Sequence, residues 1–176
     1  MRDLNEIANE CIENLKWIGI ECPHVESWTV NYRAKRFGQC RKRNGKYYIN
    51  INYRLLDERC PLQSLRETIF HELVHTLPNC MNHGVNFKKY AELISDCFAV
   101  EITRCNTYEH KYGEELAKEC KEQDKAKRQA KMKTYKIRCT RCGQICSYQR
   151  CKMPKFYKYP SLYSHNKCGG IFERWE

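Results

Sequence analysis

Long apolar segments are missing from this sequence. No run approaches the roughly 20 apolar residues that a membrane-spanning helix needs, and the chain opens on a polar stretch, Met1 to Glu6, where a leader peptide would have an apolar one. We therefore expect no membrane partner and a cytoplasmic protein, free or associated with the nucleoid. In that compartment the thirteen cysteines are expected to be reduced thiols and not a disulfide framework.

Acidic residues are missing from a long part of the chain. Between Lys125 and Lys167 there are 13 basic residues and no acidic one. The net charge of +11 comes mainly from this region, because residues 111–176 carry 17 Lys and Arg against 7 Asp and Glu, while residues 1–110 carry 15 against 14. A positive field concentrated in this way favours a polyanion, and DNA is the expected partner.

The length and the change in composition predict how the chain is divided. A chain of 176 residues has room for one sizeable core and a small additional module. We expect a main domain over residues 1–110 and a small domain over residues 135–176. Residues 111–134 are rich in Glu, Lys, Gln and Ala, which predicts a charged helical connector between the two domains.

Apolar residues recur at helical spacing in three segments of the main domain. The pattern predicts helices over residues 4–18, from Pro61 to near Pro78, and over residues 86–100. Strand patterns lie between the first two helices, over residues 28–32, 36–43 and 46–52. Asn44-Gly45 separates the last two strands and predicts a tight hairpin, because both positions of a type I′ turn need positive φ. We therefore expect a small antiparallel sheet.

The second predicted helix carries an HExxH motif, His71-Glu72-Leu73-Val74-His75. The i, i+4 spacing brings both imidazoles to one side of a helix, where they can bind the same metal ion. The opposite side is an apolar stripe that can anchor the helix in the core, formed by Leu62, Leu65, Ile69 and Leu73. Glu72 follows the first histidine and is the candidate general base for a water molecule that zinc activates.

A catalytic zinc ion has three protein ligands and one open position, so a third ligand is needed. Two residues are candidates. His83 lies eight residues after His75, beyond a predicted turn, and is followed by Gly84, which allows a close approach of the backbone. Glu92, on the third predicted helix, is the alternative. We expect His83 to be the ligand.

Taken together, these residues resemble the SprT-like metalloproteases, a family that includes the bacterial SprT proteins and the eukaryotic protease Spartan. The matching segments are residues 31–38, the HExxH motif, His83-Gly84 with Phe87, and a C-terminal cysteine module. The resemblance implies an α+β, zincin-like metalloprotease domain with a zinc ribbon after it. It also implies that His71, His75 and His83 bind zinc, that Glu72 is the catalytic base, and that the substrates are proteins bound or crosslinked to DNA.

The C-terminal module contains a Cys-x-x-Cys pair, Cys139 and Cys142, which is typical of a zinc site. Where the family ribbon has a second such pair, this chain has His165 and Cys168. Because imidazole is a competent zinc ligand, we expect these four residues to hold a second, structural zinc ion. The competing cysteines are Cys146 and Cys151.

Basic and aromatic residues alternate around this module, a mixture that suits phosphates and unpaired bases. The expected partner is therefore single-stranded or distorted duplex DNA, and RNA stays open as an alternative. In the main domain, either strand of the hairpin could hold a protein substrate along an exposed sheet edge. We expect a zinc metalloendopeptidase. The alternative is a non-catalytic nucleic-acid-binding protein in which zinc is only structural, and the sequence predicts no oligomeric state.

Overall fold

The computed structural model describes residues 1–32, 36–104 and 106–175. The chain forms two compact units, Met1–Cys120 (unit 1) and Lys121–Glu176 (unit 2). These units are a geometrical division, and the domain boundaries expected from the sequence stay a prediction. Of the segment 31–38 that contributes to the family resemblance, residues 33–35 lie outside the described part of the chain.

Unit 1 is built on a mixed sheet. Its strands are β1 (Val25–Asn31), β2 (Gly38–Arg43) and β3 (Lys46–Asn52), in the order β1-β3-β2. β2 and β3 form the predicted antiparallel hairpin, and the Asn44-Gly45 turn has the expected positive φ angles of 49° and 77°. β1, however, pairs with β3 in parallel, so the expectation of an antiparallel sheet was wrong for this strand.

The order of the strands explains the parallel pair. β1 ends at Asn31 on one edge of the sheet and β2 begins at Gly38 on the other edge, both beside the end of β3. β3 then enters between β1 and β2. It is the most apolar of the three strands, and Tyr47, Ile49 and Ile51 are buried, so the central position covers its apolar side chains best.

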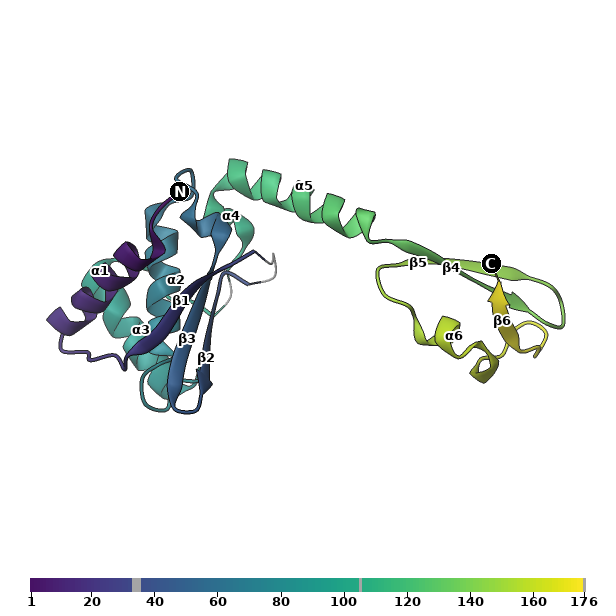
Figure 1. Ribbon diagram of the computed structural model, residues 1–176, viewed down its shortest axis with the longest axis horizontal. Helices are drawn as coiled ribbons and strands as arrows, with labels where there is room; N and C mark the ends of the chain where they lie inside the picture. Colours follow the sequence, from purple (N-terminus) through teal and green to yellow (C-terminus); the bar gives the residue numbers. More distant parts are fainter. Residues whose placement is uncertain (33–35, 105, 176) are drawn as a thin grey trace. The chain divides into compact units, whose positions relative to one another are not determined.

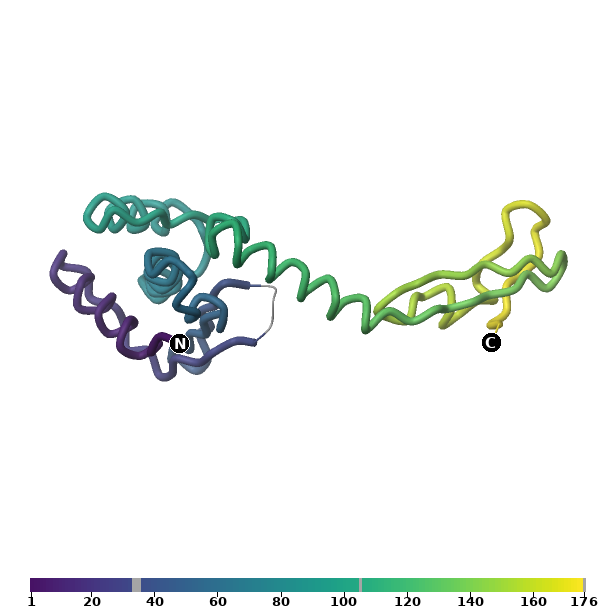
Figure 2. Tube along the Cα trace, turned by 90° about the horizontal axis from the view of Figure 1, so that it is seen from above, coloured from purple at the N-terminus to yellow at the C-terminus, as the bar shows by residue number. Residues whose placement is uncertain are grey.

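Helices cover one face of this sheet (Figure 1). Figure 2 shows α2 between α1 and α3, and Leu65, Ile69 and Leu73 of α2 are fully buried there, as the apolar stripe predicts. No helix of the described residues is long and apolar enough to cross a membrane. The helical elements of the unit are α1 (Leu4–Trp17), η1 (Tyr53–Leu56), α2 (Leu62–Val74), α3 (Val85–Phe98), α4 (Tyr108–Tyr112) and the first part of α5 (Glu114–Ala130).

Helix α2 ends at Val74, about one turn before the stop expected near Pro78. The early end has a local cause. Thr76 bonds the carbonyl oxygen of Leu73 with both its backbone N–H (2.9 Å) and its hydroxyl (2.7 Å), which satisfies a terminal carbonyl without a further helical turn. His75 is therefore the C-cap residue, and the chain turns away directly after it.

Unit 2 contains a small antiparallel sheet in the order β5-β4-β6. The strands are β4 (Lys133–Cys139), β5 (Ile145–Arg150) and β6 (Phe172–Trp175), with the short helices α6 (Lys155–Lys158) and η2 (Pro160–Leu162) before the last strand. Few of its described residues are buried: Tyr135, Ile137, Cys139, His165 and Gly170. Domains with so small a core commonly rely on a bound metal or another cross-link for their stability.

The packing of α2 makes a prediction about stability. Leu65→Ala removes a fully buried side chain and should lower the free energy of unfolding of unit 1 by about 2–5 kcal/mol. Leu93→Ala makes the same chemical change on α3 at a side chain that is 45% exposed, and should change it by less than about 1 kcal/mol. Urea unfolding followed by circular dichroism compares the two. Equal effects would contradict the assignment of Leu65 to the core.

Candidate metal centres

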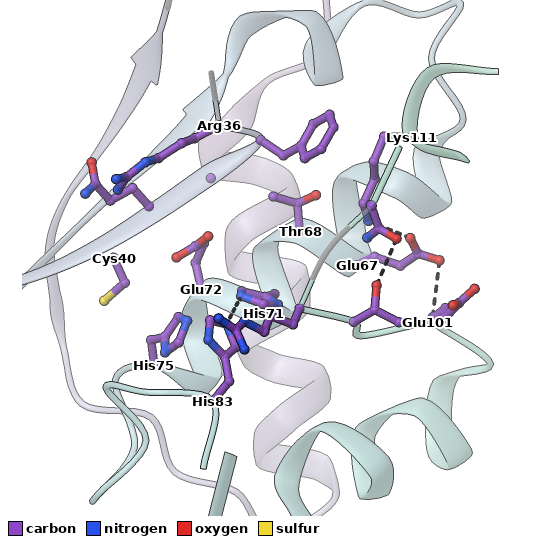
Figure 3. A pocket seen from close by; sticks show the side chains of 16 residues that line it. Arg36, Cys40, Glu67, Thr68, His71, Glu72, His75, His83, Glu101 and Lys111 are labelled. Carbon is purple, nitrogen blue, oxygen red and sulfur yellow. Dashed lines mark hydrogen bonds and ion pairs between the residues drawn. The ribbon is translucent and has the colours of Figure 1, made fainter. Parts of the chain in front are cut away.

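Three histidines come together at the end of α2. His71 lies on the helix, His75 is its C-cap, and His83 belongs to the segment before α3. One ring nitrogen from each lies within 4.8 Å of the others, and the Nε2 atoms of His71 and His83 are 3.0 Å apart (Figure 3). Two nitrogens bound to one tetrahedral zinc ion lie about 3.3 Å apart, so the arrangement is compatible with zinc.

Hydrogen bonds orient two of the three rings, those of His75 and His71. Nδ1 of His75 lies 2.7 Å from the carbonyl oxygen of Cys80, to which it can donate only as Nδ1–H, so that Nε2 is left as the ligand atom. The ring of His71 is hydrogen-bonded to the backbone of Thr103, while its Nε2 faces His83. Such outer contacts orient the ligands of a metal and select their tautomers.

Phe87 forms a common wall for the three imidazoles. Its ring centroid lies 5.0, 4.7 and 4.7 Å from those of His71, His75 and His83, and the side chain is only 3% exposed. An apolar wall excludes water from one side of the rings. Burial accordingly lowers the pKa of His71 to about 3, with a further contribution from the other two histidines, and it also lowers the pKa values of His75 and His83. Each of these shifts favours the neutral ring, the form that binds metals.

Glu92 does not join this group. It lies on α3 with an exposed side chain, and the set of potential ligands at this place contains the three histidines alone among the described residues. Of the two candidates for a third ligand, the structure thus brings His83 to His71 and His75.

Glu72 reaches the same place from α2 and is 5% exposed (Figure 3). Burial raises its pKa to about 8, although a hydrogen bond from the Cys40 backbone and the charge of Arg36 act in the opposite direction. Gly38 allows the close contact with β2, because a Cβ atom at that position would lie 2.6 Å from Oε1 of Glu72. The Glu72 carboxyl group is therefore held between α2 and β2.

A cleft of about 460 Å³ opens over the histidines and Glu72. Gly38, Gln39 and Cys40 of β2 form part of its wall, and β2 is an edge strand of the sheet. The backbone N–H of Asn52 bonds the carbonyl of Phe37 at 2.7 Å, so by alternation along the hairpin the backbone groups of Gly38 and Cys40 point away from β3. Of the two hairpin strands, β2 is the edge strand at the cleft, and one of its outward groups, the Cys40 N–H, bonds Glu72.

A buried ion pair supports the segment that holds His71. Glu67 lies one turn before His71 on α2, and its carboxylate accepts a hydrogen bond from the Lys111 ammonium at 2.7 Å and one from the backbone N–H of Glu101 at 3.2 Å. The second bond fixes the start of the segment that contains Thr103. This pair was not predicted from the sequence: Glu67 lies four residues before His71, which is a signal, but no pattern in the sequence indicates Lys111.

The second group lies in unit 2 and joins the four residues expected there, Cys139, Cys142, His165 and Cys168. Cys142 Sγ and Cys168 Sγ each lie 3.2 Å from Nδ1 of His165, and the Sγ atoms of Cys139 and Cys168 are 3.4 Å apart. Backbone hydrogen bonds, first that of Cys142, lower the pKa of the Cys139 thiol to about 6, which favours the thiolate that binds metals.

The two halves of this group are built alike. Gly143 donates its N–H to the carbonyl of Cys139 (2.9 Å) and has a φ of +73°, while Gly169 donates to the carbonyl of His165 (2.7 Å) and has a φ of +69°. His165 thus occupies in one turn the place that Cys139 has in the other. Cys146 and Cys151, the alternative ligands considered from the sequence, are not part of this group among the described residues.

The part of the chain that matches a known family lies within unit 1. A sequence model described as the SprT-like family matches residues 5–106, which include the HExxH motif and His83. A search of curated proteins finds no significant match.

The histidine group predicts a specific loss of metal. His83→Ala should lower the zinc content by one ion per chain, whereas Glu92→Ala should leave it unchanged, because only His83 lies within reach of His71 and His75. Elemental analysis of the purified variants measures both. Zinc lost from Glu92→Ala and retained in His83→Ala would reverse the choice of the third ligand.

The ion pair predicts a second effect. Glu67→Gln leaves the Lys111 ammonium buried without a partner and should reduce the stability of unit 1 by about 3–5 kcal/mol. Replacing both residues, with Glu67→Gln and Lys111→Met, should restore most of this loss because no charge stays buried. Urea unfolding of the two variants tests the coupling, and a double variant no more stable than the single one would show that the pair is not the cause.

Proposed function

Because the chain belongs to the SprT-like family, we propose that it is a zinc-dependent metalloendopeptidase that cleaves proteins bound or crosslinked to DNA. The observation that carries the proposal is the ligand set at the end of α2. Three histidines converge there, and no fourth protein ligand joins them within the described residues. A site with three protein ligands leaves a position open for water and substrate, as a catalytic zinc ion requires.

The residues around this position suit peptide hydrolysis. A zinc ion held by the three histidines would supply Lewis acidity, which polarises a scissile carbonyl and acidifies water. Glu72 would remove a proton from the attacking water and deliver it to the leaving amine as the C–N bond breaks. Gly38 and Cys40 keep this carboxylate at the wall of the cleft. The part of β2 that lines the cleft, Gly38 to Cys40, would hold the substrate as an additional antiparallel strand.

Unit 2 would bring this activity to DNA. We propose a structural zinc ion on Cys139, Cys142, His165 and Cys168, which makes the unit a zinc ribbon, because a closed set of four ligands stabilises a fold whose own core is small. Exposed tyrosines and basic residues of the ribbon would contact unpaired bases and phosphates. Three of these tyrosines are Tyr148, Tyr159 and Tyr163.

The proposal predicts a metal-loaded but inactive variant. Glu72→Gln should retain two zinc ions per chain and lose about 10²–10⁴-fold of the peptidase activity, since general acid–base catalysis contributes that much. Autocleavage and cleavage of a DNA-binding protein, each with and without single-stranded DNA, measure the activity. Glu92→Gln is the matched control and should behave like wild type, because this glutamate is exposed on α3.

A ribbon variant separates targeting from chemistry. Cys168→Ser should lose one zinc ion and the stimulation by DNA while basal cleavage persists. Two zinc ions per chain without cleavage under any condition would reject the peptidase and favour a non-catalytic nucleic-acid-binding protein.

A further inference from the structure

The sheet of unit 1 has a second face, opposite the helices. Side chains alternate between the faces of a strand, so the buried Ile49 and Ile51 point to the core, and Tyr48 and Asn50 point outward. Thr29 of β1 and Gln39 of β2 are the register partners of Asn50 on either side. The outward row is thus polar across all three strands.

A hollow of about 480 Å³ lies on this face. None of the residues that line it is acidic, and two are arginines; the lining consists of Thr29, Val30, Asn31, Arg36, Gln39, Arg41 and Asn50. Arg36 and Gln39 also line the cleft over the histidines. The hollow and the catalytic cleft therefore adjoin each other at β2.

Arg41 and Arg43 on this face have no carboxylate partner among the described residues, whereas Lys46 pairs with Glu26 at 2.9 Å. Arg41 donates to the side-chain oxygen of Gln39 at 2.8 Å, and within the described residues neither Arg41 nor Arg43 forms an ion pair. Other arginines of the unit differ: Arg59 pairs with Asp57 at 2.9 Å and Arg66 pairs with Glu10. Arg41 lines the hollow and Arg43 lies two residues further along β2, and unpaired guanidinium groups of this kind favour an anionic ligand.

An aromatic ring lies beside these charges. Tyr48 of β3 is the register partner of Arg41 and is partly exposed on the same face. A guanidinium group next to an aromatic ring can bind a phosphate and stack a base at neighbouring positions of one nucleic-acid strand. An acidic peptide would use the arginines but would have no base to place on Tyr48.

We propose that this outer face binds a single strand of nucleic acid, with phosphates at Arg41 and Arg43 and a base on Tyr48. The inference rests on the proposed function and adds a second contact, located on the peptidase unit itself. Because the hollow adjoins the cleft at Arg36 and Gln39, a strand held here would place an attached protein next to Glu72. Two contacts on one chain would also raise the affinity for long strands.

The test measures the binding of a fluorescent oligothymidylate to the full, zinc-loaded chain at several salt concentrations. Arg41→Gln with Arg43→Gln should weaken binding about tenfold and reduce the slope of log K against log salt by about 1.4, the value for two lost phosphate contacts on a single strand. Tyr48→Leu should weaken binding about fivefold through lost stacking, with the salt slope unchanged. Lys88→Gln with Lys89→Gln, on α3, removes the same charge and should leave both quantities close to wild type.

Cleavage of a DNA-free peptide should be equal in all these proteins, since none of the replaced residues lines the cleft. If the arginine and lysine variants bind the oligonucleotide equally weakly, the effect comes from net charge alone and the inference is overturned. If wild type binds and only Cys168→Ser loses binding, the inference fails and the proposed function stands. If wild type does not bind the oligonucleotide, the inference and the targeting to DNA both fail, whereas peptide cleavage still tests the peptidase.

Discussion

The packing of α2 is the constraint on which the rest of unit 1 depends. One side of the helix is buried against the sheet, α1 and α3 through Leu65, Ile69 and Leu73, and the other side must then turn His71 and Glu72 toward the cleft. A helix that rotated by a quarter turn would expose leucines and bury a carboxylate without its partners, at a cost of several kcal/mol. The apolar stripe therefore fixes the direction of the reactive side chains.

The other parts of the centre are brought to this helix by distant segments. Phe87 closes one side of the imidazoles, Gly38 lets β2 approach Glu72, and Thr103 bonds the ring of His71. Each contact also restricts motion, because the rings of His71 and His75 are hydrogen-bonded to the backbone and all three rings pack against Phe87. A preorganised site of this kind loses less entropy on binding.

Unit 2 follows a different principle. Its buried residues are few, and its two ligand turns meet only because a glycine stands where a side chain would collide: a Cβ atom at Gly170 would lie 2.7 Å from the Cys139 sulfur and 2.5 Å from Cβ of Arg141. Here the stability of the fold is expected to come from a metal, whereas in unit 1 the core exists independently of the histidines. In our proposal, zinc is therefore catalytic in unit 1 and structural in unit 2.

The sequence by itself determined the local features of this protein. The helical stripe, the HExxH spacing, the Asn44-Gly45 turn and the Cys139 pair depend on residues close together in the chain, where periodicity and φ preferences act. Only the tertiary structure decided that β1 runs parallel to β3, that β2 is the edge strand at the cleft, that His83 and not Glu92 lies beside His71, and that Lys111 pairs with Glu67. These features join segments far apart in the chain, and their partners are selected by burial and by electrostatic matching in the folded core, which no local pattern records.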